Sequence, residues 1–227
     1  MSRDYREQGE SGKVNGAAIR AESAGNWPAL WGSGPLHYNS SEFGLDQIRQ
    51  LFTSFDVNHT TANLRVGIGY DSHRLEPGGP LQVGGVAVQH DRQAVGHSDA
   101  DVLLHALVDA LLGAASMGDI GEMFPDTDPA NRGRDSGSMV SAARDRLRGE
   151  NWHIVNVDCI VMLQRPKLGS YKDAIRMRIA ELLEIPAHSV GVKAKTGEGV
   201  DAVGREEAIG AQCVALLERT AAPSESE

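Results

Sequence analysis

The chain has 227 residues, and its 22 basic and 31 acidic side chains give a formal net charge of −9. This acidity argues against a non-specific nucleic-acid or membrane-surface binder, so an anionic ligand must be held by local positive charge. Two cysteines, Cys159 and Cys213, are too few for a disulfide framework, and their apolar surroundings predict buried thiols in a reducing compartment. No apolar run reaches the ~20 residues of a membrane span and the N-terminus lacks a signal core, so we expect a cytoplasmic protein.

Two compositional regimes divide the chain. Residues 1–62 are rich in Gly, Ser, Asn and charge and lack a sustained period, which predicts a largely disordered N-terminal extension. Within it, only residues 43–55 have helical spacing and could form a short amphipathic helix. We expect a folded domain at residues 63–220 and a disordered tail at 221–227.

Strand and helix patterns alternate through the domain. Gly84-Gly85 interrupts the second strand and indicates either a bulge or a close backbone approach. Ser98 or Asp99 is the expected N-cap of the first helix. The alternation predicts an α/β (α+β sandwich) fold with a mixed sheet covered by helices. The expected strands are 65–70, 81–88, 154–163 (nearly continuous in apolar residues, hence buried) and 190–195, and the expected helices are 99–117, 136–148, 171–183 and 205–219.

Histidines and carboxylates gather around residues 71–109. Asp71 and His73 are two positions apart at a strand end, so their side chains point to the same face, and His105 lies in the following helix. Two imidazoles and a carboxylate suit a catalytic zinc ion with one open position, but they also suit non-haem iron, so the metal's identity stays open. Asp101 and Asp109 share a stripe with His105; they are either partners of its ring nitrogen or ordinary charges on a solvated face.

Glycine-rich and acidic turns follow that helix. Gly118 to Gly121 and Phe124 to Asp128 resemble an ordinary helix end and a turn, but their position beside the metal-bearing helix favours a ligand site. Residues 164–167 and 193–199 follow two strands, where α/β sheets bind ligands. Lys195, Thr196 and Glu198 could hold Mg²⁺ and phosphates there, or belong to a basic surface loop.

Four motifs occur together between about Arg65 and Leu217: D-S-H-R, H-S-D-A-D-V-L-L-H, G-D-I-G-E-M-F-P-D-T-D and V-K-A-K-T-G-E. In this order and spacing they resemble the 2-C-methyl-D-erythritol 2,4-cyclodiphosphate synthase family of the non-mevalonate isoprenoid pathway. The resemblance implies a CMP-forming lyase that cyclises 4-diphosphocytidyl-2-C-methyl-D-erythritol 2-phosphate. It also implies a ferredoxin-like or chorismate-mutase-like fold, assembled as a homotrimer with active sites between subunits. We expect a small-molecule cytidine diphosphate substrate, and neither nucleic acid nor membrane as partner.

The resemblance also implies roles for individual residues. It gives Zn²⁺ to Asp71, His73 and His105, and Mg²⁺ or Mn²⁺ to Glu198 with the substrate phosphates. It makes His97 and Thr196 the pair that stabilises the transition state. The cytidine pocket draws on Leu163 to Gly169, with Ala194 and Lys195. The remaining substrate-binding residues it implies are Ser98, Asp119, Ile120, Gly121, Phe124, Pro125, Asp126, Thr127, Asp128, Pro166, Lys167, Gly197 and Arg205.

Three other readings share these ligands. A metal-dependent phosphohydrolase would use metal-bound water and release inorganic phosphate. A non-catalytic protein with a structural metal is disfavoured, because such zinc sites are usually closed by cysteine and both cysteines lie outside the cluster. A paralogue that binds cytidine nucleotides without catalysis stays open, since Ala202 stands where some family members place Phe.

Overall fold

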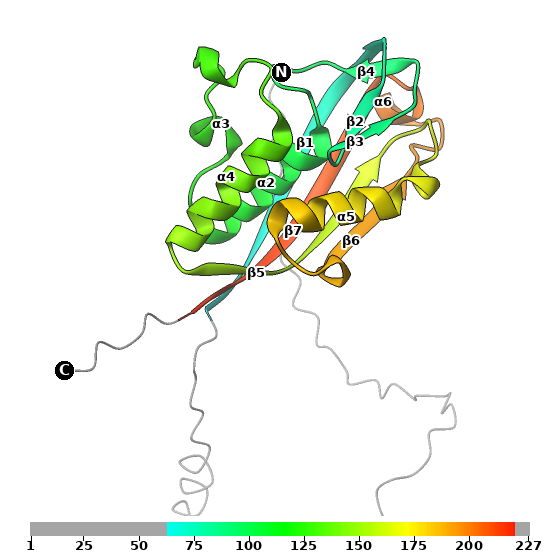
Figure 1. Cartoon of the computed structure of the whole chain (residues 1–227). Coiled ribbons are helices and arrows are strands. Elements are labelled where there is room, and N and C mark those ends of the chain that lie inside the picture. Colours follow the sequence, from blue (N-terminus) through cyan, green and yellow to red (C-terminus); the bar gives the residue numbers. More distant parts are fainter. Residues whose placement is uncertain (1–62, 221–227) are drawn as a thin grey trace, which may run out of the picture. The chain divides into compact units, whose positions relative to one another are not determined.

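A computed structural model describes residues 63–220, in which strands and helices alternate as predicted (Figure 1). The expected extension at 1–62, its helix at 43–55 and the expected tail at 221–227 lie outside the described residues. Within the described part, no helix is both long and apolar enough to cross a membrane.

The main sheet is mixed, as predicted. Its five strands lie in the order β4-β1-β7-β5-β6, where β5 and β6 are parallel and the other neighbours antiparallel. The strands are β4 (Arg92–Ala94), β1 (Asn63–Pro77), β7 (Ala208–Arg219), β5 (Trp152–Met162) and β6 (Val190–Lys195). The positions expected for β5 and β6 are confirmed within two residues. In β5, however, burial alternates, with Val157, Cys159 and Val161 buried and Asp158 partly exposed, so only one face of this strand is covered.

Residues 81–88 form a hairpin, so the prediction of one continuous strand there is wrong. Strands β2 (Leu81–Val83) and β3 (Val86–Val88) pair antiparallel. Gly84 and Gly85 connect them with φ angles of 63° and 73°. Two successive residues at positive φ make a tight hairpin turn, and glycine adopts that conformation without steric cost.

Three long helices cover one face of the sheet (Figure 1). They are α2 (Val102–Ala115), α4 (Ser136–Gly149) and α5 (Lys172–Leu183), which confirms the three helices expected there. The core lies between these helices and the sheet. Short turns complete the domain: α3 (Ile120–Met123), α6 (Asp201–Gly204), and the 3₁₀ turns η1 (Pro129–Asn131), η2 (Leu168–Ser170) and η3 (Ala187–Ser189).

The helix predicted at 205–219 is wrong, because most of this segment is the strand β7. Ala and Leu residues gave the segment its helical character. In the structure Ile209, Cys213 and Leu217 are buried among alternating positions of the strand. Strand β7 lies between β1 and β5, so hydrogen bonding on both sides and burial of one face override local helix propensity.

Strand β1 presents two different faces. On the inner face a Cβ at Gly67 would lie 2.0 Å from the carbonyl oxygen of Ala110, so glycine allows α2 to lie directly on the strand. The outer face carries apolar side chains that no other described element covers. These are Leu64, Val66, Ile68 and Tyr70, with exposed fractions of 52%, 68%, 62% and 61%.

Candidate metal centre and active site

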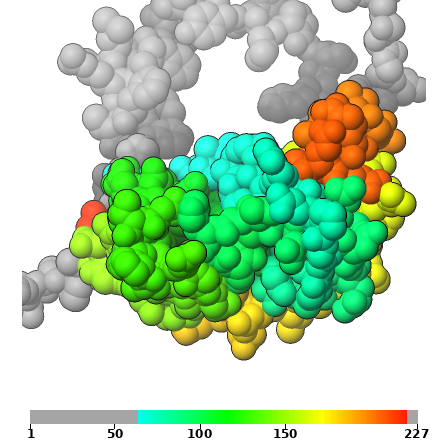
Figure 2. Space-filling model, turned by 90° about the horizontal axis from the view of Figure 1, so that it is seen from above, coloured from blue at the N-terminus to red at the C-terminus, as the bar shows by residue number. Residues whose placement is uncertain are grey.

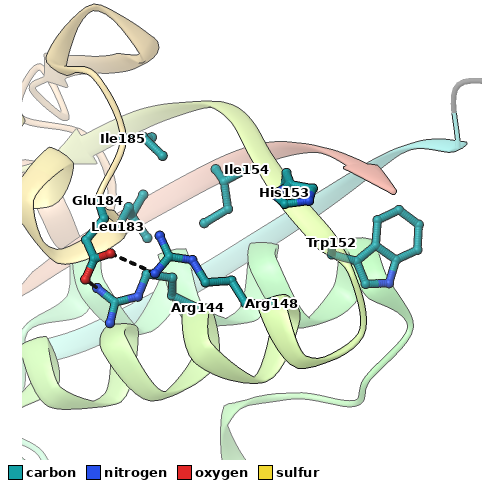
Figure 3. Close-up of a pocket in the computed structure, with 8 residues that line it drawn as sticks. All are labelled: Arg144, Arg148, Trp152, His153, Ile154, Leu183, Glu184 and Ile185. Atoms are coloured by element: carbon teal, nitrogen blue, oxygen red, sulfur yellow. Dashed lines mark hydrogen bonds and ion pairs between the residues drawn. The ribbon is translucent and has the colours of Figure 1, made fainter. Parts of the chain in front are cut away.

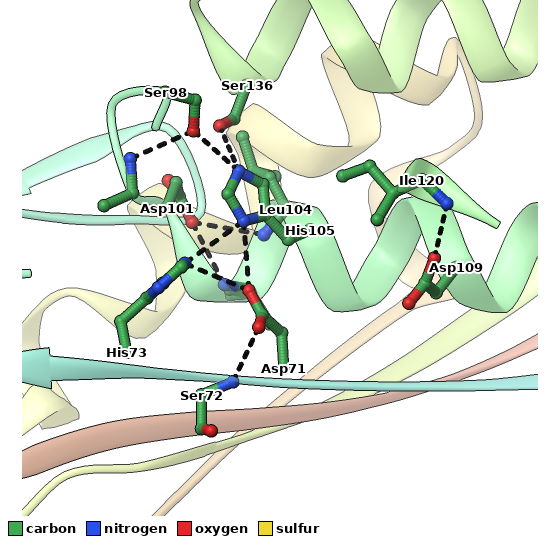
Figure 4. Close-up of polar contacts among 12 residues, drawn as sticks. Asp71, Ser72, His73, Ser98, Asp101, Leu104, His105, Asp109, Ile120 and Ser136 are labelled. Atoms are coloured by element: carbon green, nitrogen blue, oxygen red, sulfur yellow. Dashed lines mark hydrogen bonds and ion pairs between the residues drawn. The ribbon is translucent and has the colours of Figure 1, made fainter. Parts of the chain in front are cut away.

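The three predicted metal ligands meet between β1 and α2 (Figure 4). Asp71 and His73 lie within β1 and on its inner face, where Gly67 and Gly69 allow α2 to approach. His105 comes from the first turn of α2. Nδ1 of His105 lies 3.0 Å from Oδ2 of Asp71 and 3.2 Å from Nε2 of His73, and Nε2 of His73 lies 3.1 Å from the same Asp71 oxygen.

These distances fit a bound metal ion. Zinc–nitrogen and zinc–oxygen bonds of about 2.0–2.1 Å at tetrahedral angles place neighbouring donor atoms about 3.3 Å apart. The three observed separations lie within a few tenths of that value. The residues therefore fit a divalent ion held by two imidazoles and one carboxylate.

Burial and hydrogen bonding act in opposite directions on Asp71. Burial raises the pKa of its carboxyl group, but hydrogen bonds with the rings of His105 and His73, together with their charge, outweigh that effect. The net result is a pKa held well below the usual range. Asp71 is therefore ionised at neutral pH and ready to bind a cation.

Asp101 and Asp109 do not bond the His105 ring, and the fully buried Asp101 is not a charge on a solvated face either. Asp101 is the N-cap of α2, in place of Ser98 or Asp99, and accepts hydrogen bonds from the backbone N–H groups of Leu103 and Leu104. Asp109 accepts from the backbone N–H of Ile120 at 2.8 Å. The far nitrogen of the His105 ring, Nε2, instead lies 2.9 Å from the hydroxyls of both Ser98 and Ser136.

A pocket of about 300 Å³ lies at the predicted phosphate and polyol motifs. It brings His97 together with Asp126 and Thr127, as predicted, and His97 Nδ1 lies 3.6 Å from an Asp126 carboxylate oxygen. Pro129, Asn131 and Arg132 also line it, and the sequence motifs did not indicate them.

The neighbouring motif residues have structural contacts as well. Asp119 caps α3 through the N–H of Glu122, and Asp128 caps η1 through the N–H of Ala130. The guanidinium of Arg134 lies 4.7 Å from the centre of the Phe124 ring. Of the segment Asp119 to Asp128, only Asp126 and Thr127 line the His97 pocket. Contact of these residues with a substrate stays a prediction.

A second pocket, of about 180 Å³, joins the loops after β5 and β6. It unites Leu163, Lys167 and Gly169 with Ala194, Lys195 and Thr196, the segments expected to form the cytidine pocket. Lys172, at the start of α5, also lines it and was not predicted. The sequence signal that could have indicated Lys172 is its position four residues after Leu168.

The other residues predicted in this region, Pro166, Gly197, Glu198 and Arg205, do not line the second pocket. Thr196 donates its hydroxyl hydrogen to the Glu198 carboxylate, and Arg205 pairs with Glu207 at 3.1 Å. Pro166 and Gly197 lie in the same two loops.

The two pockets share no residue. Figure 2, which looks onto the end of the molecule near α3 and α6, shows the green segment around α3 and the orange segment around α6 on opposite sides. One chain therefore presents the segment around α3, which leads to the pocket residues Asp126 and Thr127, on one side and the segment around α6, which follows the loop of Thr196 and Glu198, on the other.

Comparison with known proteins assigns the chain to a family. The family model described as the YgbB family matches residues 64–218. The chain belongs to the YgbB family. The 2-C-methyl-D-erythritol 2,4-cyclodiphosphate synthase of Rhodopirellula baltica is 54% identical over 155 residues, which cover 68% of this chain and 93% of that protein. That of Gemmatimonas aurantiaca is 52% identical over 154 residues, covering 68% and 93%.

A solved structure agrees with the YgbB assignment. The structure of 2C-methyl-D-erythritol-2,4-cyclodiphosphate synthase in a CDP-bound form superposes with a TM-score of 0.64 and 38% sequence identity. The match covers 68% of this chain and all of that one. The α/β fold and its mixed sheet are thus those of a solved YgbB-type synthase.

A third pocket, of about 180 Å³, lies away from the YgbB motifs between α4, the start of β5 and the end of α5 (Figure 3). Arg144 and Arg148 line it, and both pair with Glu184, at 2.8 and 2.7 Å. None of the predicted site residues, all of which the structure describes, lies there. We interpret this pocket as an ion-paired junction between two helices.

Proposed function

We propose that this YgbB-family protein is a 2-C-methyl-D-erythritol 2,4-cyclodiphosphate synthase of non-mevalonate isoprenoid biosynthesis. It converts 4-diphosphocytidyl-2-C-methyl-D-erythritol 2-phosphate to the cyclic diphosphate and releases CMP. The observation that carries this proposal is the convergence of Asp71, His73 and His105 beside the His97 pocket. Relatives that match nearly their whole length bear the name of this enzyme.

We assign a zinc-type divalent ion to Asp71, His73 and His105, and Mg²⁺ or Mn²⁺ to Glu198 together with the substrate phosphates. Such ions, when bound, polarise phosphoryl oxygens and offset the repulsion between anionic phosphates. Asp71 supplies the negative charge of the first site, and the two imidazoles leave a coordination position open.

The chain's own residues then position a tethered nucleophile. An oxygen of the 2-phosphate forms a bond to the β-phosphorus, while the bond from that phosphorus to the CMP oxygen breaks and CMP takes the electron pair. Because both groups belong to one substrate, folding it into an attack geometry removes most of the entropic cost. His97 and Thr196 donate hydrogen bonds to the charge that develops on the phosphoryl oxygens.

The phosphate loop has to rearrange for these roles. In the structure the Thr196 hydroxyl donates a hydrogen bond to the Glu198 carboxylate, so each group is the hydrogen-bond partner of the other. In these roles Thr196 would donate to a phosphate oxygen and Glu198 would hold the cation, in place of their contact with each other. Ser98, Lys195, Gly197 and Arg205 are the other phosphate contacts that we propose.

The remaining parts of the substrate, methylerythritol and cytidine, are assigned to the two pockets. Asp119, Ile120, Gly121 and the segment Phe124 to Asp128 hold the methylerythritol part, whose hydroxyls suit carboxylate acceptors. Pro166 and Lys167, with the backbone near Lys195, hold cytidine in the second pocket. Solved relatives support a nucleotide there, since two of them are described with CDP, one of which comes from Plasmodium falciparum.

We further propose a homotrimer with active sites between subunits, of the ferredoxin-like or chorismate-mutase-like type. The uncovered apolar face of β1 supports association, because Val66, Ile68 and Tyr70 would otherwise face water. The separation of the two pockets on one chain supports shared sites, since a neighbouring copy can bring its loop of Thr196 and Glu198 to the His97 pocket. The two buried free thiols fit a cytoplasmic location.

Incubation with the diphosphocytidyl substrate tests the function. Phosphorus NMR should show equal amounts of CMP and cyclic diphosphate with Mg²⁺ present, loss of both with a chelator, and recovery with Zn²⁺ plus Mg²⁺. Release of inorganic phosphate without cyclic product would instead identify a phosphohydrolase. Nucleotide binding by a metal-loaded protein that forms no CMP would identify a non-catalytic paralogue.

A further inference from the structure

The ring of His105 is held from the side opposite the ligand cluster. Its Nδ1 faces Asp71 and His73, while its Nε2 lies 2.9 Å from Ser136 Oγ. Ser136 is the first residue of α4 and fully buried, so its hydroxyl can reach only neighbouring protein groups. Figure 4 shows Ser136 and Ser98 above the His105 ring and Asp71 with His73 below it.

Asp99 fixes the direction of the Ser136 hydroxyl. One Asp99 carboxylate oxygen accepts the hydroxyl hydrogen of Ser136, and the other accepts the Ser136 backbone N–H at 3.1 Å. A serine hydroxyl has a single hydrogen, and here an anionic carboxylate takes it. Towards His105, Ser136 can therefore only accept a hydrogen bond.

This constraint decides the tautomer of the ring. Because Ser136 only accepts, Nε2 of His105 must carry the hydrogen, and Nδ1 keeps its lone pair. That lone pair points at the position where the ligand atoms converge. We propose that Asp99 and Ser136 are positioning residues that hold His105 in its metal-binding tautomer and orientation, acting through each other in series.

Ser98 also contacts the His105 ring, but its role differs from that of Ser136. Its Oγ accepts from the backbone N–H of Ala100 at 3.2 Å and lies 2.9 Å from Nε2 of His105. No carboxylate takes its hydroxyl hydrogen within the described residues, so this hydrogen stays available for an anion beside His97. Ser136 is the fixed support of the ring, whereas Ser98 faces the substrate side.

The inference rests on the proposed metal centre, but its test needs no turnover. Zn²⁺ affinity is measured by chelator competition in Ser136→Ala and Asp99→Ala, with Ser138→Ala as the control. Ser138 lies on the same helix, and its hydroxyl contacts Asp135 and Arg134 but not His105. Partners of this kind typically contribute about 10- to 100-fold to metal affinity, so Ser136→Ala should lose about tenfold or more and Ser138→Ala less than about twofold.

The double variant tests the series arrangement. If Asp99 acts only through Ser136, Asp99→Ala combined with Ser136→Ala should lose no more affinity than Ser136→Ala alone. Nitrogen NMR of the zinc-loaded protein gives a second reading. Wild type should show His105 with its hydrogen on Nε2 and zinc on Nδ1, and Ser136→Ala should show a smaller share of this tautomer.

Either of two results would overturn the proposal: unchanged affinity and tautomer in a folded Ser136→Ala variant, or a loss confined to Ser98→Ala. Should Ser136→Ala not fold, Asp99→Ala decides, because Asp99 is exposed and its removal leaves the buried serine in place. A protein that binds zinc as expected but forms no CMP leaves this inference intact and refutes only the proposed activity.

Discussion

Gly69 of β1 lies directly against Ala106 of α2. A Cβ at Gly69 would stand 1.9 Å from the carbonyl oxygen of Ala106 and 2.6 Å from the N–H nitrogen of Ala110, distances that no packing can accommodate. Since His105 precedes Ala106 and Asp71 follows Gly69 by two residues, this contact sets the distance between the two halves of the metal centre.

Gly69→Ala should therefore destabilise the protein and open the metal centre. Forcing backbone atoms apart typically costs about 1–3 kcal/mol or more. We expect a lowered Tm and weakened Zn²⁺ binding in the same variant. The control is Gly149→Ala at the end of α4, where an added Cβ meets nothing within 4 Å. Normal zinc affinity in Gly69→Ala would show that α2 can shift without moving His105.

His105→Ala should nearly abolish turnover while leaving the fold intact. The side chain supplies one of three donor atoms and is only partly buried, so its removal affects the metal more than the core. Metal content and CMP release are measured together with circular dichroism. A near-normal rate in this variant would remove His105 from the centre. His153→Ala is a suitable control, because His153 is exposed and contacts Thr220.

Asp101→Asn should reduce the free energy of unfolding. The fully buried Asp101 carboxylate accepts from the N–H groups of Gly84 and Gly85 at 2.8 and 2.6 Å, besides capping α2. An amide group would turn an N–H towards one of these donors, and leaving a buried donor unpaired costs about 1–3 kcal/mol. Asp135→Asn, at the exposed N-cap of α4, should be nearly neutral because Asn caps as well as Asp. Equal urea midpoints for the two variants would contradict a stabilising role for the buried Asp101 carboxylate.

Asp71 should give the metal-free protein a characteristic acid dependence. The folded-state pKa of Asp71 is depressed. Its stabilising contribution is therefore present above the unfolded-state pKa, near the ordinary value of 3.8, and is lost as the pH falls through the lower folded-state pKa. Unfolding of wild type and Asp71→Asn in chelator should differ at mildly acidic pH and converge as the solution becomes strongly acidic. A difference that grows on acidification would reverse the sign of this coupling.

Val66→Glu should break the proposed trimer. A charge in the middle of the uncovered face of β1 is unfavourable once that face is buried against another copy. Light scattering should give the mass of a trimer for wild type and of a monomer for Val66→Glu. Met177→Glu is the control, since Met177 is 56% exposed on α5. An unchanged trimer would place the interface elsewhere.

The sequence alone identified the three candidate metal ligands that the structure brings together. Asp71 and His73 had to share a face because strand side chains alternate, and His105 lay on the one strongly apolar helix that follows. Helices α4 and α5 and strands β5 and β6 were likewise readable from periodicity. The loops after β5 and β6 were expected near a ligand because both follow strands, and the structure brings Lys167 and Lys195 into one pocket.

Only the tertiary structure decided the rest. The segment 208–219 is a strand because β1 and β5 bond it on both sides, a constraint that its Ala- and Leu-rich sequence does not carry. Asp101 could have been a partner of the histidine ring or a solvated charge, but it is a buried N-cap that also binds the backbone of Gly84, 17 residues earlier in the chain. Ser136 reaches His105 across 31 residues of chain. Such contacts depend on how elements pack, and hydrogen-bond partners distant in sequence leave no periodic trace in it.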